Sequence, residues 1–579
     1  MHVVLDQLFW IQVMPASFKS LSELLEKVEA TKKRLEIIDL TANYLKTLAV
    51  EEIEPATNMM VGRAFPKYSQ KSMEVSWSTL TQVFERISQF DWNLWGQAMT
   101  RTGDIGSATK VVLEKAKAKK QTQLTAQTLT ILEVRRSLEA ISQASGAGSR
   151  NKKERLITAL LSQATPVEAK YLVKIFTGEM RTGLQEGLME QAVAKAFNVP
   201  LHQVQHAGMV LGDLGEVALA LKAEGAAGLE KVCFTVFRPV NLMLAQTAQT
   251  VEEALMEQGG KSAFEYKYDG ARVQIHVQNG AVQVFSRRLT DVTESLPEII
   301  ESVKCNLKVQ SAIVEGEVVS LDSAGYPIAF QHLMRRFKRV RDVPGMAKRI
   351  PLTLYLFDIL FLEGHSLITL PYSQRRQILA ENAGEIPLSK RLVTEKVDKA
   401  GSFLKEAIAA GHEGLMAKKL DSPYTPGRRG KKWLKIKTIL EPLDLAITAA
   451  EYGYGRRKGW LSDYYLAARD PATGGFLDVG KTFKGLTDAE IVEMTKRLKD
   501  SVILEGGHRV TVIPKIVVEV AYNEIQRSPK YKSKMALRFA RISRVRDDKT
   551  PEEADTINKV REIYERQFQQ KGKYAQKND

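Results

Sequence analysis

The chain has 579 residues, of which 44% are hydrophobic and 26% are charged, and its formal net charge is +16. This length exceeds what one hydrophobic core supports and predicts about three or four domains. No stretch approaches the roughly 20 apolar residues that a membrane helix needs. The two cysteines, Cys233 and Cys305, exclude a disulfide framework and a cysteine zinc site and favour a reducing, intracellular compartment. The excess of positive charge favours a polyanionic partner.

The first third of the chain has helical periodicity. Apolar residues recur at three- and four-residue spacing in SLSELLEKVEATKKRLEIIDLTANYLKTL and TPVEAKYLVKIFTGEM. The pattern predicts an all-α domain over residues 1–235. Within it, Lys115, Lys117, Lys119 and Lys120 could bind phosphates, although a solvated helix face is the commoner meaning of such a run.

The pattern changes near FRPVNLMLAQ. The segment AFEYKYDGARVQIHVQNGAVQVFSR alternates polar and apolar residues around Asn279-Gly280, which predicts a β-hairpin. Further strands are expected at SAIVEGEVVSLD, LTLYLFDILFL and WLKIK, with helices such as YSQRRQILAENA between them. An α+β domain is therefore expected over residues 236–440.

The last part of the chain is rich in short strand patterns. They occur in DLAITAAEYG, YYLAARD, GFLDVGKTF and RVTVIPKIVVEVAYNEI, with TDAEIVEMTKRLKD as a helix among them. Five or so strands and a helix predict an OB-fold β-barrel over residues 441–579, with a C-terminal helical tail.

The segment EYKYDGARVQIHV carries the most specific chemical signal. A lysine attacks phosphorus only as the free amine, so Lys267 would need a pKa lowered by burial or by positive charge, for which Arg272 is close enough in sequence. Taken alone, the tetrapeptide KYDG is more often an exposed lysine beside an Asp-Gly turn.

Further candidate residues follow in order. IVEGEVVS places Glu315 and Glu317 on one face of a strand, where a carboxylate could hold a metal ion. LYLFDIL offers Phe357 and Asp358, and HEGLMAKK offers Glu413 and Lys418. WLKIK alternates, so Lys435 and Lys437 share a face that suits a phosphate chain.

These segments resemble, in order and approximate spacing, the motifs of the covalent nucleotidyltransferases, and the whole looks like an ATP-dependent DNA ligase of the archaeal or bacterial three-domain type. KYDG resembles the nucleophile motif. The later motifs are SRR (Ser286 to Arg288), EGEVV, YLFDIL, EGLMAKK, WLKIK and RFARISRVRDDK. The chain departs from the family at Arg288, where Asn is usual, and at Ala540, where Pro is common. Both departures concern local backbone shape, and Arg288 is left unassigned.

The resemblance implies a role for each matching residue. Lys267 becomes the adenylated nucleophile. The implied ATP- or AMP-binding residues are Glu265 (adenine), Arg272 (ribose), Phe357 (stacking), Arg287, Glu317, Lys418, Lys435, Lys437, Arg546 and Lys549. Glu317 and Glu413 are the implied metal ligands, and Asp548 belongs to the motif that closes over ATP. Phe357 could instead be plain core.

The resemblance further implies the reaction and the partners. It implies ATP as co-substrate, Mg²⁺ or Mn²⁺ as cofactor and nicked duplex DNA as partner, in replication, repair or recombination. A monomer inside a prokaryotic cell is expected. The alternatives are an mRNA-capping guanylyltransferase or RNA ligase, which share the nucleotide core, and a DNA-binding scaffold without catalysis. The helical N-terminal third argues against the first two.

The segment QKSMEVSW, residues 70–77, partly resembles a sliding-clamp peptide. Gln70 and Met73 are in place, but Ser76 stands where an aromatic residue belongs. Clamp binding is one expectation, and an ordinary helix face is the other.

Overall fold

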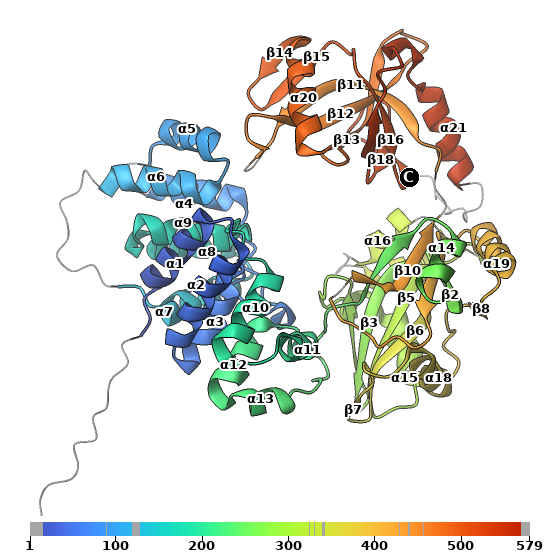
Figure 1. The fold of residues 1–579 in the computed structure, drawn as a ribbon, viewed down its shortest axis with the longest axis horizontal. Helices are drawn as coiled ribbons and strands as arrows, with labels where there is room; N and C mark the ends of the chain where they lie inside the picture. Colours follow the sequence, from blue (N-terminus) through green and yellow to red (C-terminus); the bar gives the residue numbers. More distant parts are fainter. Residues whose placement is uncertain are drawn as a thin grey trace, which may run out of the picture. The chain divides into compact units, whose positions relative to one another are not determined.

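The computed structural model describes residues 15–87, 90–117, 128–322, 325–328, 330–337, 342–427, 429–437, 440–454 and 457–568. The chain divides into two compact units, Met1–Asn241 and Leu242–Asp579 (Figure 1). Among the described residues, no helix is both long and apolar enough to cross a membrane.

The first unit is helical, as predicted. Its helices are α1 (Phe18–Ala30), α2 (Arg34–Thr47), α3 (Val50–Met60), α4 (Trp77–Arg86), α5 (Trp92–Thr102), α6 (Ile105–Lys117), α7 (Ile131–Gln143), α8 (Ser149–Gln163), α9 (Pro166–Thr177), α10 (Glu186–Phe197), α11 (Leu201–Leu211), α12 (Leu214–Glu224) and α13 (Ala226–Glu230). Lys119 and Lys120 lie outside the described residues.

Local sequence fixes the ends of these helices. The Thr165 side chain accepts a hydrogen bond from the Glu168 N–H, and the Glu168 side chain accepts one from the Thr165 N–H, so a capping box begins α9. Pro166 occupies the first turn, and Gly178 ends the helix with φ +68°. The buried face of α9 then joins the core of the unit, which includes Tyr171.

Ion pairs also join α1, α6 and α9. Glu26 binds Lys110 at 2.6 Å and also binds Lys170, while Glu29 binds Lys174 at 3.1 Å. Burial raises the pKa of Glu26, but hydrogen bonds from Lys110 and Lys170 outweigh burial and lower it to about 2.

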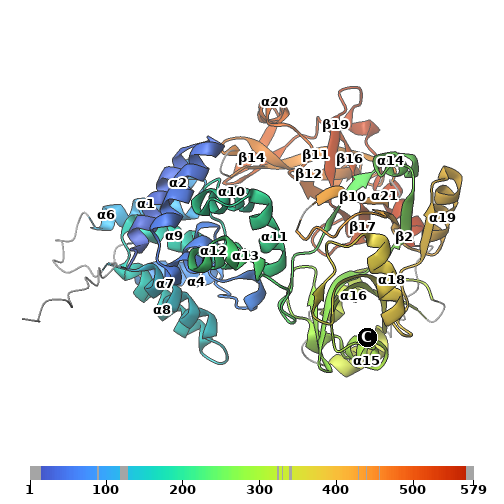
Figure 2. The same cartoon turned by 60° about the horizontal axis from the view of Figure 1, so that its bottom comes forward.

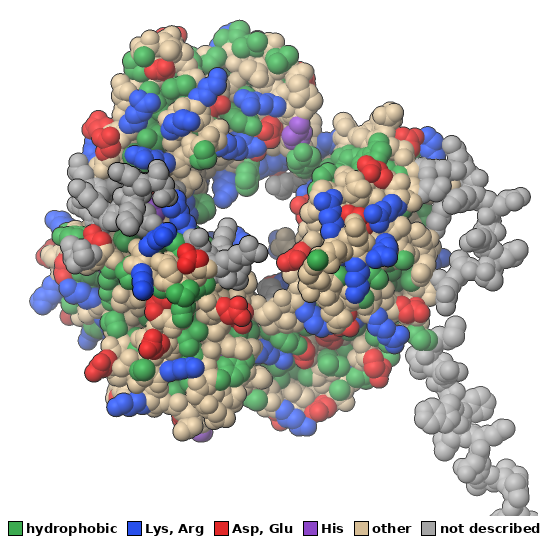
Figure 3. Space-filling view, turned by 180° about the vertical axis from the view of Figure 1, so that it is seen from behind, with side chains coloured by type: hydrophobic (Ala, Val, Ile, Leu, Met, Phe, Trp, Pro, Cys, Tyr) green, Lys and Arg blue, Asp and Glu red, His purple; other side chains and the backbone are tan. Residues whose placement is uncertain are grey.

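Basic and acidic side chains are interspersed on the surface in Figure 3.

The predicted α+β region contains two five-stranded sheets. The first has the order β1 (Leu244–Ala248), β10 (Arg429–Lys437), β9 (Gly414–Lys419), β2 (Ser262–Lys267), β8 (Arg391–Thr394). The second has the order β4 (Ala281–Ser286), β3 (Ala271–Gln278), β5 (Ser311–Ser320), β6 (Leu352–Leu362), β7 (His365–Ser366). The predicted hairpin is β3–β4, and φ is positive at both Asn279 (49°) and Gly280 (77°), as a type I′ turn requires.

Helices cover one face of each sheet. The helices of this region are α14 (Val251–Glu257), α15 (Pro297–Asn306), α16 (Phe330–Phe337), α17 (Val343–Arg349), α18 (Tyr372–Asn382) and α19 (Val397–Ala409). Helices α15, α16 and α18 pack on the sheet that contains β3, and α14 and α19 pack on the sheet that contains β2 (Figure 2).

The C-terminal region is β-rich, as predicted for an OB-type domain. Its elements are β11 (Leu443–Tyr452), β12 (Leu461–Arg469), β13 (Phe476–Thr482), α20 (Asp488–Lys499), β14 (Val502–Gly506), β15 (Arg509–Val512), β16 (Val517–Ala521), β17 (Glu524–Arg527), β18 (Met535–Arg538), β19 (Arg541–Val545) and α21 (Ile557–Phe568). The long strand β11 pairs with β12 along one edge and with β16 and then β15 along the other.

Candidate active site

Strand alternation sorts the residues of the α+β region into a core and a polar layer. On β2, β9 and β10, alternate residues join the core beneath α14 and α19: Phe264, Tyr266, Leu415, Ala417, Leu434 and Ile436. On β3 and β5, they join the core beneath α15, α16 and α18: Val273, Ile275, Val277, Ala312 and Val314. The intervening residues face the other way, between the two sheets. This polar layer contains Glu265, Lys267, Arg272, Gln274, Glu315, Glu317, Lys418, Lys435 and Lys437.

Lys267 ends β2 and lies in an acid–base cluster. Its Nζ is 2.6 Å from Glu413 Oε2, and the Nζ of Lys437 is 2.5 Å from the same oxygen. The Glu413 N–H donates to the Lys267 carbonyl at 2.9 Å, which fixes the acid beside the lysine. The structure therefore brings together three of the predicted residues from β2, β10 and the loop before β9.

The pKa of Lys267 differs from the expectation. Burial lowers it, but the Glu413 and Glu317 carboxylates outweigh burial, and the pKa lies above its usual value. Glu315 pairs with the Arg272 guanidinium and offsets its positive charge, so Arg272 does not bring the pKa of Lys267 below its usual value. Lys267 is thus held as an ammonium beside Glu413. Burial raises the pKa of Glu413, but Lys267 and Lys437 outweigh burial and lower it to about 2.

Gly270 brings the segment after Lys267 close to β5. A Cβ on Gly270 would lie 2.5 Å from the Val318 carbonyl oxygen and 2.8 Å from Glu317 Cγ. Only glycine fits this approach without a shift of the backbone. The glycine of KYDG is therefore explained by space, and it sets the separation between Lys267 and β5.

Glu317 and Glu315, which were predicted to share a face, have different surroundings. Glu315 is fully buried and binds Arg272 at 2.8 Å and the Tyr424 hydroxyl at 2.8 Å. Glu317 accepts no hydrogen bond from the part of the chain that the structure describes. Burial raises the pKa of Glu317 to about 7, although Lys267 and Arg272 act in the opposite direction. Glu317 is therefore the carboxylate left available for a ligand.

Positive charge accumulates beside Lys267. Burial lowers the pKa of Lys435, and Lys437, Arg429, Lys267 and Arg287 lower it further. Arg287 is exposed just after β4. These groups make one end of the polar layer strongly electropositive, which suits a chain of phosphates.

Arg272 and Phe357 lie deeper in the layer. The Arg272 guanidinium donates to the Met243 carbonyl at 2.8 Å and lies 5.4 Å from the ring centres of Phe357 and Trp433. Its Nε is buried with no acceptor among the described residues. Phe357 is 9% exposed and lines the polar layer, so its ring lies among cations and another aromatic ring.

Lys418 lies apart from the cluster around Lys267. It is 1% exposed, and its Nζ is 2.8 Å from Glu265 Oε2. Lys418 was predicted to bind phosphate. Its position beside Glu265, the residue expected to bind adenine, instead favours a role near the base.

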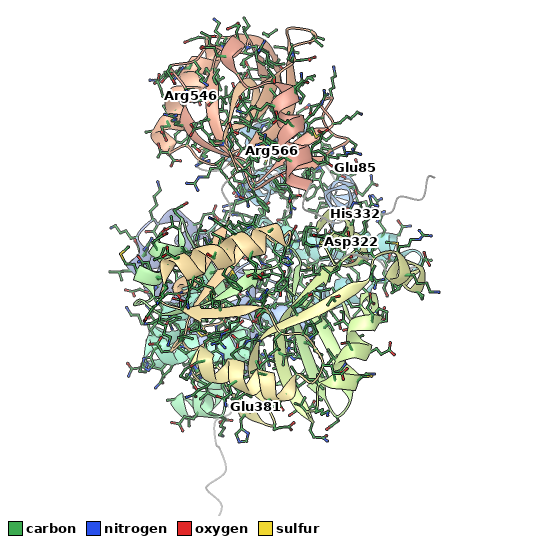
Figure 4. The ribbon with its side chains drawn as sticks, turned by 90° about the vertical axis from the view of Figure 1, so that its right-hand side faces the viewer. Glu85, Asp322, His332, Glu381, Arg546 and Arg566 are labelled. Atoms are coloured by element: carbon green, nitrogen blue, oxygen red, sulfur yellow. The ribbon has the colours of Figure 1, made fainter. Side chains whose placement is uncertain are left out.

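Arg546, which is labelled in Figure 4, and Lys549 follow β19 in the C-terminal domain. Arg546 donates to both carboxylate oxygens of Asp444, at 2.9 and 2.8 Å, and to Asp548 at 2.8 and 2.7 Å. Lys549 donates to Asp444 at 2.7 Å. The cations of the last motif are thus held by an acid at the start of β11.

Sequence reasoning missed several residues of the layer. Trp433 was detectable, because it alternates with Lys435 and Lys437 on β10. Tyr372, Ser389 and Tyr424 gave no signal, because each reaches the layer from an element distant in sequence.

A lysine held by an acid and a second lysine between two sheets, followed in the chain by a β-rich domain with basic residues at its end, defines the class of covalent nucleotidyltransferases. Residues 17–194 match the family described as DNA ligase N terminus, 242–437 the ATP dependent DNA ligase domain, and 457–549 the ATP dependent DNA ligase C terminal region. The chain belongs to the family of ATP-dependent DNA ligases.

Individual relatives match over nearly the whole chain. A DNA ligase 1 from Korarchaeum cryptofilum is 46% identical over 95% of this chain and 98% of its own length. A DNA ligase from Thermococcus onnurineus is 42% identical over 96% of this chain and 99% of its own. The solved structure named Pmar-Lig_Pre has a TM-score of 0.58 and 17% identity over 91% of this chain and 99% of that one, and supports the fold alone.

Proposed function

We propose that this ligase seals nicks with 5′-phosphate and 3′-hydroxyl ends in duplex DNA through a lysyl-AMP intermediate on Lys267. The observation that carries the proposal is the Lys267–Glu413–Lys437 cluster, with Nζ–Oε2 distances of 2.6 and 2.5 Å. It supplies a nucleophile, an acid that positions the nucleophile and a cation for phosphate oxygens in one place.

The reaction comprises three transfers at phosphorus. Lys267 loses its ammonium proton to water, and the free amine forms a bond to the α-phosphorus of ATP as the bond to pyrophosphate breaks, while Glu413 holds the amine in place. AMP then moves to the DNA 5′-phosphate, and the 3′-hydroxyl displaces AMP as the strand is joined. Each step builds negative charge on phosphate oxygens, which Lys435, Lys437 and Arg287 stabilise.

The deeper residues bind the nucleoside. Glu265 contacts adenine, and Phe357 stacks on the base. Arg272 contacts the ribose, which would satisfy the buried Nε that lacks an acceptor among the described residues.

The donor set is compatible with Mg²⁺ or Mn²⁺. Among the described residues, no cluster of three or more His, Cys, Asp or Glu side chains forms a closed metal cage. Mg²⁺ commonly takes one or two carboxylates, substrate phosphates and waters, and Glu317 and Glu413 are the carboxylates proposed. A bound ion supplies positive charge against the leaving pyrophosphate. Because Glu317 has no hydrogen-bonding partner among the described residues, its carboxylate is ready to bind such an ion.

The C-terminal domain is proposed to act in turn on ATP and on DNA. Arg546 and Lys549 would exchange Asp444 for nucleotide phosphates in the first step, and the segment 441–444 would permit the motion. We retain residues 1–235, 236–440 and 441–579 as the functional division. All three domains would bind phosphates of the duplex as one monomer within a prokaryotic cell, so affinity for nicked DNA should fall steeply with salt.

Transfer of label from nucleotide to protein tests the proposal. Purified protein is incubated with Mg²⁺ and α-labelled ATP or GTP and then separated by denaturing electrophoresis. Lys267→Ala should abolish labelling, and Lys261→Ala, which removes an exposed lysine just before β2, should not. Label from ATP that nicked duplex DNA discharges supports the proposal. Label from GTP would indicate a capping enzyme, discharge only by RNA an RNA ligase, and no label a scaffold.

We also propose that Gln70 contributes to binding a sliding clamp. Gln70, Lys71 and Ser72 are exposed, and Trp77 is 45% exposed at the start of α4. Met73, in contrast, packs partly against the helical core. Gln70→Ala should weaken binding of a purified archaeal clamp in sedimentation experiments, while Ser72→Ala should not; equal binding by both variants would refute the proposal.

A further inference from the structure

Glu265 is a buried acid with an unusually complete set of hydrogen-bond donors. It is 2% exposed on β2. Its Oε1 accepts from the Tyr372 hydroxyl, and its Oε2 accepts from Ser389 Oγ at 2.8 Å and from Lys418 Nζ at 2.8 Å. A carboxylate offers about four acceptor positions. Three protein donors therefore leave about one position for a ligand.

Glu265 is the acid that Lys418 binds directly. The nearest carbonyl is that of Phe357, at 3.4 Å, and the ring centres of Phe357, Tyr372 and Trp433 lie 4.6, 5.0 and 4.5 Å from its Nζ. Three aromatic faces and one carboxylate thus surround the ammonium. Burial lowers the pKa of Lys418, while Glu265 opposes that shift.

The geometry also separates Lys418 from the lysines expected at phosphates. Lys267 and Lys437 share Glu413, whereas Lys418 pairs with Glu265. Lys418 lies opposite Ala263 in the β2–β9 register, and Glu265 lies opposite Met416, so the Lys418 side chain reaches diagonally along the strands to its partner. Two buried charges that satisfy each other in this way fix each other's position.

We propose that Lys418 is a positioning residue for nucleotide selection, which holds the Glu265 carboxylate turned so that its remaining acceptor position meets the base. An adenine amino group donates to that position. The guanine carbonyl would instead place an acceptor against an acceptor, which leaves the carboxylate unpaired. The inference rests on the proposed function, with Glu265 as the residue that contacts the base.

The test compares nucleotides, because a general loss of structure or phosphate binding lowers both reactions together. Single-turnover labelling of the full chain is measured with ATP and with GTP for wild type, Lys418→Met and Lys435→Met. Lys418→Met should reduce the ratio of kcat/KM for ATP to that for GTP by about tenfold or more, chiefly through KM for ATP. Lys435→Met should slow both nucleotides and preserve the ratio.

Milder variants keep the proposal testable if Lys418→Met does not fold. Tyr372→Phe and Ser389→Ala each remove one donor to the same carboxylate and should lower the ATP-to-GTP ratio of kcat/KM by a smaller factor. Lys418→Arg keeps the positive charge, so its ratio should lie between those of Lys418→Met and wild type. An unchanged ratio in Lys418→Met, or in both milder variants, overturns the inference and leaves the proposed function intact. A wild-type protein that takes no label from ATP overturns both.

Discussion

Replacing Gly270 by alanine adds a single methyl group at the closest approach between the nucleophile segment and β5. The methyl carbon would lie 2.5 Å from the Val318 carbonyl oxygen, whereas ordinary contacts begin at 3.4 Å. Relief requires a shift of about 0.9 Å, and the atom in the way belongs to the backbone of a central strand. The Lys267 side chain would move with its segment relative to Glu317.

A misplacement of about 1 Å at a reacting group can cost about 100-fold in rate. We therefore expect Gly270→Ala to slow formation of lysyl-AMP by about 10- to 100-fold, with a loss of stability of about 1–3 kcal/mol from overpacking. Rapid-quench measurement of labelled protein gives the rate, and urea unfolding gives the stability.

Gly280→Ala is the matched control at the other end of β3. No atom lies within 4 Å of a Cβ there, but φ is +77°, so the expected cost is about 1–2 kcal/mol of backbone strain. Its rate of lysyl-AMP formation should stay near that of wild type. If Gly270→Ala reacts as fast as Gly280→Ala, the spacing between Lys267 and β5 is not what the glycine protects.

Three further outcomes are expected, each followed by urea unfolding with tryptophan fluorescence. Because the folded pKa of Glu26 is lowered to about 2, its stabilisation is present above pH 4.5 and is lost as pH falls towards 2, so Glu26→Gln should be less stable than wild type at pH 7 but not at pH 2. The folded pKa of Glu317 is raised to about 7, so its ionisation destabilises the fold as pH rises from 4.5 through 7, and Glu317→Gln should abolish that decline; a parallel decline in the variant would contradict the assignment. Arg375→Met leaves the fully buried Asp358 without the partner that binds it at 2.8 Å and should cost about 3–5 kcal/mol, whereas a loss below 1 kcal/mol would show that Asp358 finds another donor or a proton.

The sequence alone predicted those features of the fold and site that depend on neighbouring residues, such as strand alternation and hairpin turns. Alternation in WLKIK predicted that Lys435 and Lys437 share a face, and β10 confirms it. Asn279-Gly280 predicted a hairpin turn, and both residues have positive φ. In these segments the periodicity of the backbone alone decides which way a side chain points.

Long-range contacts were beyond the same reasoning. Tyr372 and Ser389 lie 107 and 124 residues from Glu265, so no spacing in the sequence connects them. The direction of the Lys267 pKa shift was likewise missed, because it depends on the balance between burial and two acids on other elements. Which of two neighbouring acids is available for a ligand, Glu315 or Glu317, depends on the position of Arg272 across the sheet.

The same alternation that builds the polar layer restricts how this chain can change its length. In β2, β9 and β10, lysines or acids that face the polar layer alternate with apolar residues that pack in the core beneath α14 and α19. Deleting one residue within such a strand would exchange the two sets, burying Lys435 among apolar side chains and turning Leu434 towards the nucleotide. Insertions and deletions among functional variants should therefore fall in connections such as the turn at Gly280, and the spacing within each of these strands should stay fixed.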